Sequence, residues 1–125
     1  MSHPDSEPGK SISFTNPERA AQIYHILCAA ACDRRTITYG LLAELTGAFP
    51  ANLGYLLGYI MRFCDRHNPP LPPLTVLVVQ TGTGKPGEGL STSRDHDADR
   101  ERVYTFDWYK RVRPPLPQEL VEFAN

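Results

Sequence analysis

The segment between Thr36 and Gly89 constrains the fold of this chain more than any other segment. It reads TITYGLLAELTG, then ANLGYLLGYIMRFCDRHN, then PPLPPLTVLVV, and finally the loop QTGTGKPGEG. This order predicts two helices joined by a tight turn, followed by an apolar strand and a glycine-rich loop. A helix-turn-helix with such a loop as its wing is a common way to present one helix to the major groove of DNA.

The composition bounds the class of protein. The chain has 125 residues, which is enough for one domain with a hydrophobic core. Its net charge of −1 does not by itself indicate a nucleic-acid-binding protein. No apolar run reaches the roughly 18 residues of a membrane helix, and the N-terminus MSHPDSEPGKS lacks the apolar core of an export signal. The three cysteines are therefore expected to be reduced thiols of a cytoplasmic protein without a membrane partner.

The sequence predicts three parts. Residues 1–15 carry little to bury and are predicted to form a disordered tail, residues 16–113 a domain, and residues 114–125 a C-terminal extension. The first helix is expected to begin at Asn16-Pro17-Glu18, with Asn16 as its cap. The run that follows is apolar on most sides, so this helix is expected to be central to the core.

The second and third helices have clear start and stop signals. Thr38 is a good cap for a helix over residues 39–45, which Gly47 would end. Pro50 opens a third helix over about residues 51–67, whose apolar side chains recur at three- and four-residue steps. The prolines that follow His67 would end it.

The remaining elements are short. Residues 74–79 are β-branched and apolar, which predicts a buried strand, and the glycines of residues 82–89 predict a loop. Residues 99–109 follow an acidic helix start and suit a helix, although the alternation of aromatic side chains at 104, 106 and 108 also permits a strand. Residues 118–124 suit a last helical turn. The predicted class is mainly α with a small β element, arranged as a winged helix-turn-helix domain.

Several of these residues match a known family. The phrase Thr38-Tyr39-Gly40-Leu41-Leu42-Ala43 resembles the "(S/T)YGxLA" start of the helix-turn-helix in alkylguanine-DNA alkyltransferases and in the non-enzymatic alkyltransferase-like proteins. Leu57-Gly58 resembles the "VG" of that family's recognition helix, and Val78-Val79 before a glycine-rich loop resembles the segment after its active-site strand. The likeness covers roughly residues 17–110 and implies a DNA-binding winged helix. The same segment resembles small bacterial proteins that pair "ITYG" with "TG-x-PGEG".

The residues that perform alkyl transfer in that family do not match. Aligned through Val78-Val79, the family's "PCHRV" motif places Thr75 at the acceptor cysteine and Val76 at the histidine. An acceptor must be a thiol that a neighbouring group activates. We therefore expect no alkyl transfer and no enzymatic activity. The arginine that the family inserts into the base stack falls on Tyr55, and an aromatic ring can also wedge between bases.

Candidate DNA contacts lie at the front of the helix-turn-helix and along the third helix. The hydroxyls of Thr38 and Tyr39 can contact phosphates, or Thr38 caps the helix while Tyr39 packs on the core. Asn and Arg side chains on the third helix can read base edges, although a solvated helix face also has such side chains. The predicted DNA-binding residues are Arg35, Thr38, Tyr39, Asn52, Tyr55, Tyr59, Arg62 and Lys85.

The loop Thr81–Lys85 superficially resembles a phosphate-binding loop. The Walker pattern requires glycine where Val79 stands, and serine or threonine where Pro86 stands. A nucleotide site is therefore disfavoured. Lys85 is expected either to touch a phosphate from a wing or to lie in a plain turn.

Two clusters carry side chains of the kinds that bind metals. Cys28 and Cys32 form one pair, and Cys64 and His67 form another, but zinc ligands usually lie closer together on loops, and cysteines on apolar helices are ordinarily buried. The acidic run 95–99 around a histidine suits a metal or acid/base site, or a solvated loop. In both clusters the second interpretation is favoured, so no metal, cofactor or catalytic residue is predicted.

These observations together predict a non-enzymatic DNA-binding protein of winged helix-turn-helix type. The third helix would enter a groove, and residues 82–89 would flank the backbone. The expected partner is double-stranded DNA, bound weakly and with strong salt dependence because few cations are available. The alternative is a protein-interaction module that keeps the fold and has lost DNA binding. The near-neutral charge and the tyrosine at position 55 favour this alternative.

Overall fold

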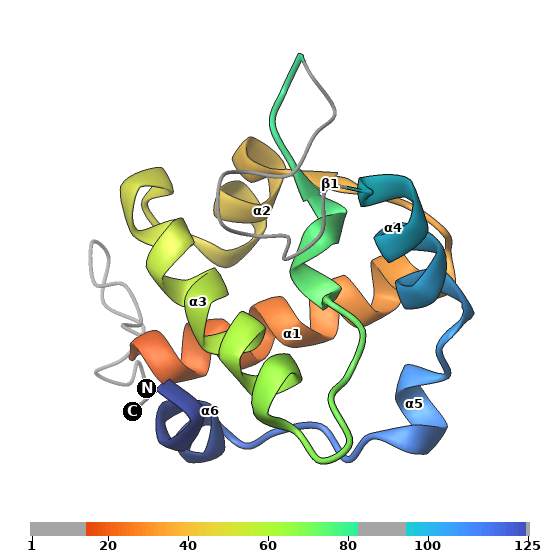
Figure 1. The fold of residues 1–125 in the computed structure, drawn as a ribbon. Coiled ribbons are helices and arrows are strands. Elements are labelled where there is room, and N and C mark those ends of the chain that lie inside the picture. The colour runs from red at the N-terminus through yellow and green to blue at the C-terminus, as the bar shows by residue number, and fades with distance from the viewer. Residues whose placement is uncertain (1–14, 83–94, 125) are drawn as a thin grey trace, which may run out of the picture.

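The structure is a computed structural model that describes residues 15–82 and 95–124. It is mainly helical, and its described sheet consists of two strands (Figure 1). The elements are α1 (Asn16–Cys32), β1 (Ile37–Thr38), α2 (Tyr39–Thr46), α3 (Pro50–Arg66), the 3₁₀ helix η2 (Leu74–Leu77), β2 (Val78–Val79), α4 (His96–Thr105), α5 (Trp108–Arg111) and α6 (Pro117–Ala124). The predicted class, mainly α with a small β element, is confirmed. The predicted tail, apart from Thr15, and most of the predicted wing lie outside the described residues.

Helix α1 begins with a capping box. The Thr15 hydroxyl accepts a hydrogen bond from the Glu18 N–H, and Glu18 Oε1 accepts one from the Thr15 N–H at 2.9 Å. This reciprocal pair satisfies two backbone donors that the helix start leaves free. The prediction of Asn16 as the cap is therefore wrong by one residue. Asn16 Oδ1 instead accepts a bond from Asn52 Nδ2 of α3 at 3.3 Å, which ties the starts of the two helices together.

Helix α1 ends in a turn that points one arginine at another helix. Arg34 has a positive φ of 54°, and the Arg35 N–H donates to the Ala30 carbonyl at 2.9 Å. This is the bond of a Schellman turn, in which a residue in the left-handed region closes the helix. The Arg34 guanidinium then pairs with Glu101 of α4 at 2.9 Å and lies over the Tyr104 ring. Arg34 therefore connects α1 to α4.

The α2–turn–α3 unit forms as its start and stop signals predict. The Thr38 hydroxyl accepts a hydrogen bond from the Leu41 N–H at 3.2 Å, and Gly47 ends α2 with a φ of 70°. Pro50 lies in the first turn of α3. Helix α3 then buries a continuous apolar side against α1 and α6, which includes Leu53, Leu56, Leu57, Ile60 and Phe63. This unit, with α2 beside the first half of α3, lies along one side of the molecule (Figure 1).

Residues 74–79 differ from the predicted strand. They form the 3₁₀ turn η2 and then only two strand residues, although all six side chains are buried. An uninterrupted apolar run is compatible with a buried strand and with a buried 3₁₀ turn, because every side chain is buried in each case. Strand β2 pairs in parallel with β1, with Ile37 opposite Val78 and Thr38 opposite Val79. A wing hairpin would be antiparallel, so this pair is not a wing.

The C-terminal part closes the core. Asp95 caps α4 by accepting from the Ala98 N–H, and Trp108 of α5 donates from Nε1 to the Val103 carbonyl at 2.9 Å. The predicted helix over 99–109 is thus two helices with a break after Thr105, and the strand alternative is wrong. Helix α6 packs against α1 and α3 with Leu120 fully buried, so the predicted extension 114–125 supplies part of the core.

Candidate nucleic-acid interface

The outward side of α3 carries a supported aromatic ring. Tyr55 is 55% exposed, whereas Tyr59, one turn later, is 7% exposed. Their rings meet edge to face with centroids 5.2 Å apart, and their hydroxyls are hydrogen bonded at 3.1 Å. This hydrogen bond raises the pKa of Tyr59 above its ordinary value. Tyr59, predicted as a surface contact, is instead buried and supports the exposed Tyr55 ring through these two contacts.

Arg62 continues this row along α3. Its guanidinium lies 5.8 Å from the centre of the Tyr59 ring and against the main chain at Gly58, where a Cβ would meet it at 3.3 Å. Its Nε is buried and has no hydrogen-bond partner among the described residues. The arginine is therefore held next to the tyrosine pair by ring and backbone contacts. A ligand that approaches α3 would find its charge already placed.

Gly54, beside Tyr55, leaves the backbone of α3 uncovered by any side chain. A Cβ built at this position would meet no described atom within 4 Å, and the residue lies inside the helix. Glycine destabilises a helix interior by about 0.5–1 kcal/mol relative to alanine. Internal packing therefore gives no reason for glycine here, whereas a partner that lies close to the helix axis would.

The other predicted contacts are placed differently. The Thr38 hydroxyl is used in capping α2, as the alternative interpretation expected, and Tyr39 is half-buried, which raises the pKa of its phenol. Asn52 is half-buried and bonded to Asn16. Arg35 is exposed near the end of α1. The fold thus groups Asn52, Tyr55, Tyr59 and Arg62 on α3 and leaves Arg35, Thr38 and Tyr39 near the start of α2; Lys85 lies outside the described residues.

Sequence reasoning missed an apolar stripe on α2 and the turn after it. Leu41, Leu45 and Phe49 are 47%, 58% and 80% exposed. Leu41 and Leu45 are four residues apart on α2, the spacing of neighbours on one helix face, whereas Phe49 lies beyond the left-handed Gly47 that ends this helix. The opposite side of α2 buries Leu42 and Ala43, so α2 is apolar on both sides. That pattern was visible in the sequence, because Leu41 and Leu45 fall on a different side of this short helix from Leu42, and one core cannot bury both sides.

The apolar stripe adjoins a hollow between α1 and α2. The hollow has a volume of about 220 Å³ and shares Leu41 with the stripe. It is lined by Ala29, Ala30, Asp33, Arg35, Thr36, Ile37 and Leu41.

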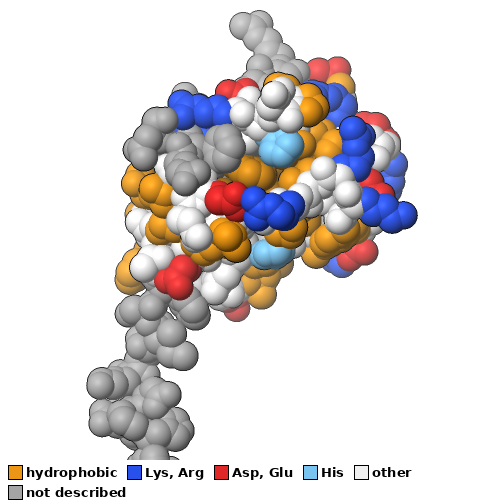
Figure 2. Space-filling view, turned by 90° about the horizontal axis from the view of Figure 1, so that it is seen from below, with side chains coloured by type: hydrophobic (Ala, Val, Ile, Leu, Met, Phe, Trp, Pro, Cys, Tyr) orange, Lys and Arg blue, Asp and Glu red, His pale blue; other side chains and the backbone are white. Residues whose placement is uncertain are grey.

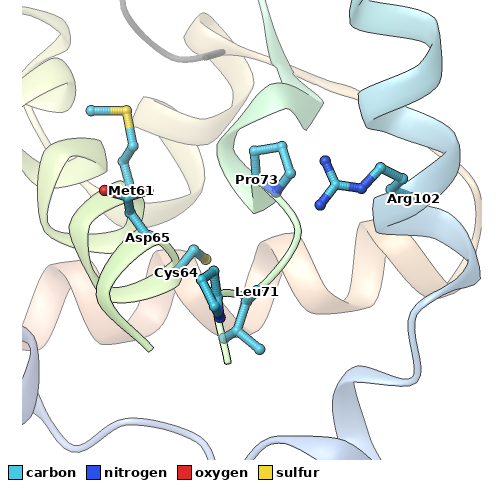
Figure 3. Close-up of a pocket in the computed structure, with 7 residues that line it drawn as sticks. Met61, Cys64, Asp65, Leu71, Pro73 and Arg102 are labelled. Atoms are coloured by element: carbon cyan, nitrogen blue, oxygen red, sulfur yellow. The ribbon is translucent and has the colours of Figure 1, made fainter. Parts of the chain in front are cut away.

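Two of the three thiols, those of Cys28 and Cys64, are buried, and that of Cys32 is exposed. Burial raises the pKa of both Cys28 and Cys64 to about 12, which leaves them protonated and poorly nucleophilic at neutral pH. Cys64 lines a second hollow of about 160 Å³ with Met61 and Asp65, and Arg102 points toward Pro73 on its far side (Figure 3). Within residues 15–82 and 95–124, no group of three or more His, Cys, Asp or Glu side chains is placed to hold a metal ion.

Many cations of the described part are held by acids. Ion pairs join Arg34 to Glu101, Arg100 to Asp97, Arg102 to Asp99, and Arg113 to Glu119. On the face shown in Figure 2, Lys and Arg side chains are interspersed with acidic and hydrophobic ones. Arg34, next to the predicted contact Arg35, is turned to Glu101 of α4. The described surface therefore offers DNA a small number of cations near α3.

No family model matches the chain, and neither a curated protein nor a solved structure matches it. Among the described residues, no helix has the length and apolarity required to cross a membrane.

Proposed function

We propose that this protein binds duplex DNA without catalysing a reaction, through α3 of a winged helix-turn-helix unit. The observation that carries the proposal is the open face of α3, where the exposed Tyr55 ring stands beside the uncovered backbone of Gly54. Aromatic and apolar side chains that wedge between base steps need such a projecting position. A glycine beside the wedge lets the helix backbone approach the groove closely.

The neighbouring side chains suit this role. Tyr59 is buried and contacts the Tyr55 ring, so this exposed ring is held in a defined position on α3. Arg62 supplies a charge one turn away for a phosphate or a guanine edge. The resemblance to the non-enzymatic alkyltransferase-like proteins points the same way. Thr75, at the position of the family's acceptor cysteine, is fully buried in η2.

The wing in this proposal is the segment after β2. Because β2 is paired in parallel with β1, these two strands are not the wing, and the predicted wing, residues 82–89 with Lys85, lies outside the described residues except for Gly82. Arg35 and Tyr39, close to the start of α2, would contact phosphates on the other side of α3.

The test is a salt series of binding to a random duplex, measured by fluorescence anisotropy. We expect a dissociation constant on the order of 10⁻⁴–10⁻⁶ M at physiological salt, with a steep loss of affinity as salt is added. Tyr55→Ala should weaken binding by about 1–3 kcal/mol, the cost of losing one base–aromatic contact. Its matched control is Tyr109→Ala, which removes a similarly exposed ring on α5.

A second pair of variants tests the charge. Arg62→Ala should lower the slope of log K against log[salt] by about one if the guanidinium meets a phosphate. The control is Arg111→Ala. Arg111 also lies over an aromatic ring, that of Phe106, but it belongs to α5 and not to α3. Binding that is equally indifferent to all four substitutions, or no binding at low salt, would refute the proposal.

A second candidate function is a protein-interaction module on the same fold that has lost DNA binding. The ion pairs that occupy many described arginines favour it, since few charges remain for phosphates. In that case the Tyr55 face would bind a protein, and hot spots of protein interfaces are rich in tyrosine and arginine. Absence of salt-dependent DNA binding, together with loss of a partner on Tyr55→Ala, would decide for this candidate.

A further inference from the structure

The hollow between α1 and α2 lies where two helix ends of opposite polarity meet. Its lining includes Ala29 and Ala30 from the last turn of α1 and Leu41 from the first turn of α2. The carboxyl end of a helix carries a partial negative charge, and the amino end of a helix carries a partial positive charge. One side of the hollow therefore favours a cation, and the other side favours an anion.

Two side chains add full charges to this hollow. Asp33 directly follows α1, Arg35 precedes β1, and both line the hollow. Arg34 between them is in the left-handed region and turned to α4. Within residues 15–82 and 95–124, the side chains of Asp33 and Arg35 form no hydrogen bond or ion pair with each other or with a third residue. In the second hollow, by contrast, Arg102 is paired with Asp99.

Most of the remaining lining is apolar. Ile37 is buried, and Leu41 is 47% exposed, with the two alanines of α1 beside them. The volume of about 220 Å³ is below the roughly 300–1,000 Å³ of pockets that take drug-sized ligands. The hollow is therefore too small for a nucleotide and suits a small molecule that has an ammonium group, a carboxylate and a short apolar part.

We infer that this hollow binds a free α-amino acid with an aliphatic side chain, such as leucine. The ligand's ammonium group meets Asp33 at the carboxyl end of α1, and its carboxylate meets Arg35 on the side of α2. Its side chain lies against Ile37 and Leu41. Both polar contacts are hydrogen bonds between charged groups, which are stronger than neutral ones. A zwitterion pairs with both protein charges at once, whereas a simple acid or amine pairs with one of them.

The inference goes beyond the proposed DNA binding and does not depend on it, because the amino acid is tested without DNA. The two ligands nevertheless share one side chain, since Arg35 is also a predicted phosphate contact. An amino acid in the hollow would therefore compete with DNA for Arg35.

The first experiment is a titration of the full chain with L-leucine, followed by ¹H–¹⁵N nuclear magnetic resonance. We expect a dissociation constant on the order of 0.1–1 mM for so small a ligand, with the largest shifts at residues 29–41. Three compounds each lack one part of leucine. They are 4-methylpentanoate without the ammonium group, 3-methylbutylamine without the carboxylate, and glycine without the side chain. Each should bind about tenfold more weakly, because one contact is lost.

Variants test the placement of the ligand. Asp33→Asn and Arg35→Gln should each weaken leucine binding by about tenfold. Ala29→Leu should abolish it, because the added side chain fills the hollow from an exposed position. The matched controls are Asp65→Asn, which neutralises an exposed carboxylate of the second hollow, and Ala51→Leu, which adds the same side chain at an exposed alanine of α3. Circular dichroism checks that all five variants fold.

Three results would overturn the inference. Absence of shifts at residues 29–41, with leucine at tenfold the expected constant, excludes the site. Equal binding of leucine and 4-methylpentanoate shows that the ammonium group is not recognised. Leucine binding that the variants of Asp33 and Ala29 reduce no more than their controls do takes place elsewhere on the protein.

Discussion

Three glycines of the α2–turn–α3 unit should respond differently to the same change, replacement by alanine. Gly54 lies inside α3, and a Cβ there meets no described atom within 4 Å. Gly58 lies one turn later, where a Cβ would be 3.3 Å from the Arg62 guanidinium. Gly47 ends α2 with a φ of 70°. The added methyl group is identical in each case, so any difference in stability reports the local backbone and packing.

The expected magnitudes follow from these environments. Gly54→Ala should stabilise the fold by about 0.5–1 kcal/mol, the helix preference of alanine with no packing cost. For a domain of this size, that change raises the Tm by about 1–6 °C. Gly58→Ala gains the same preference but displaces Arg62 from its ring contact, worth about 0.5–1 kcal/mol, so the net change should be near zero. Gly47→Ala should destabilise by about 1–2 kcal/mol, because alanine resists the left-handed region.

Chemical and thermal denaturation followed by far-ultraviolet circular dichroism measures all three variants. Trp108, the one tryptophan of the chain, is buried and gives an independent fluorescence signal of unfolding. Destabilisation by Gly54→Ala would show that this position is packed and would remove the argument for an open backbone. Equal shifts for Gly54→Ala and Gly47→Ala would refute the whole reasoning. A Gly54→Ala variant that is more stable and yet binds DNA more weakly would support both the argument and the proposed function.

Two further predictions concern titratable groups. In native protein at pH 8, iodoacetamide should modify Cys32 rapidly, but Cys28 and Cys64 only after denaturation. Burial shields the thiols of Cys28 and Cys64 and raises the pKa of each to about 12. Peptide mass mapping checks this, and rapid labelling of Cys64 in native protein would contradict it. The hydrogen bond from Arg34 lowers the pKa of Glu101 below its ordinary 4.5, so the pair should stabilise the fold above that pH and lose its effect as the pH falls through the lowered pKa. Glu101→Gln should therefore be less stable than wild type at neutral pH and equal to it in strong acid, as urea titrations at several pH values would measure; a difference that persists in strong acid would contradict it.

Local signals made the first half of the fold predictable. Thr38, Gly47 and Pro50 act through their own backbone geometry, which does not depend on distant residues, and each has the predicted role. The error at the start of α1 is also local. Thr15 with Glu18 is a capping box, and this two-residue signal outweighs the single preference of Asn16.

Non-local contacts explain what the sequence did not predict. Residues 74–79 are apolar throughout, and only the position of β1, about forty residues earlier, determines that two of them pair as a strand. Tyr59 has the sequence spacing of a surface residue on α3, yet the elements packed around it leave it 7% exposed. The role of Leu120 in the core depends in the same way on where α6 folds back.

The candidate site was predicted in part. The α3 residues Tyr55 and Arg62 do lie together, as a face at three- and four-residue steps requires. Arg34 could not be placed from the sequence, because its direction depends on the left-handed turn that closes α1 and on a carboxylate 67 residues later. The exposed side chains of Leu41, Leu45 and Phe49 were not among the predicted site residues.

The position of α6 determines the order in which the chain can fold. Helix α1 begins at Asn16, and the helix that covers it together with α3 begins at Pro117. The core therefore closes only when segments about one hundred residues apart meet, and loop closure over such a distance slows folding. A ribosome-bound chain would expose the α6-facing side of α1 until synthesis had passed Leu120. This domain should accordingly fold late in translation, and cooperatively once it begins.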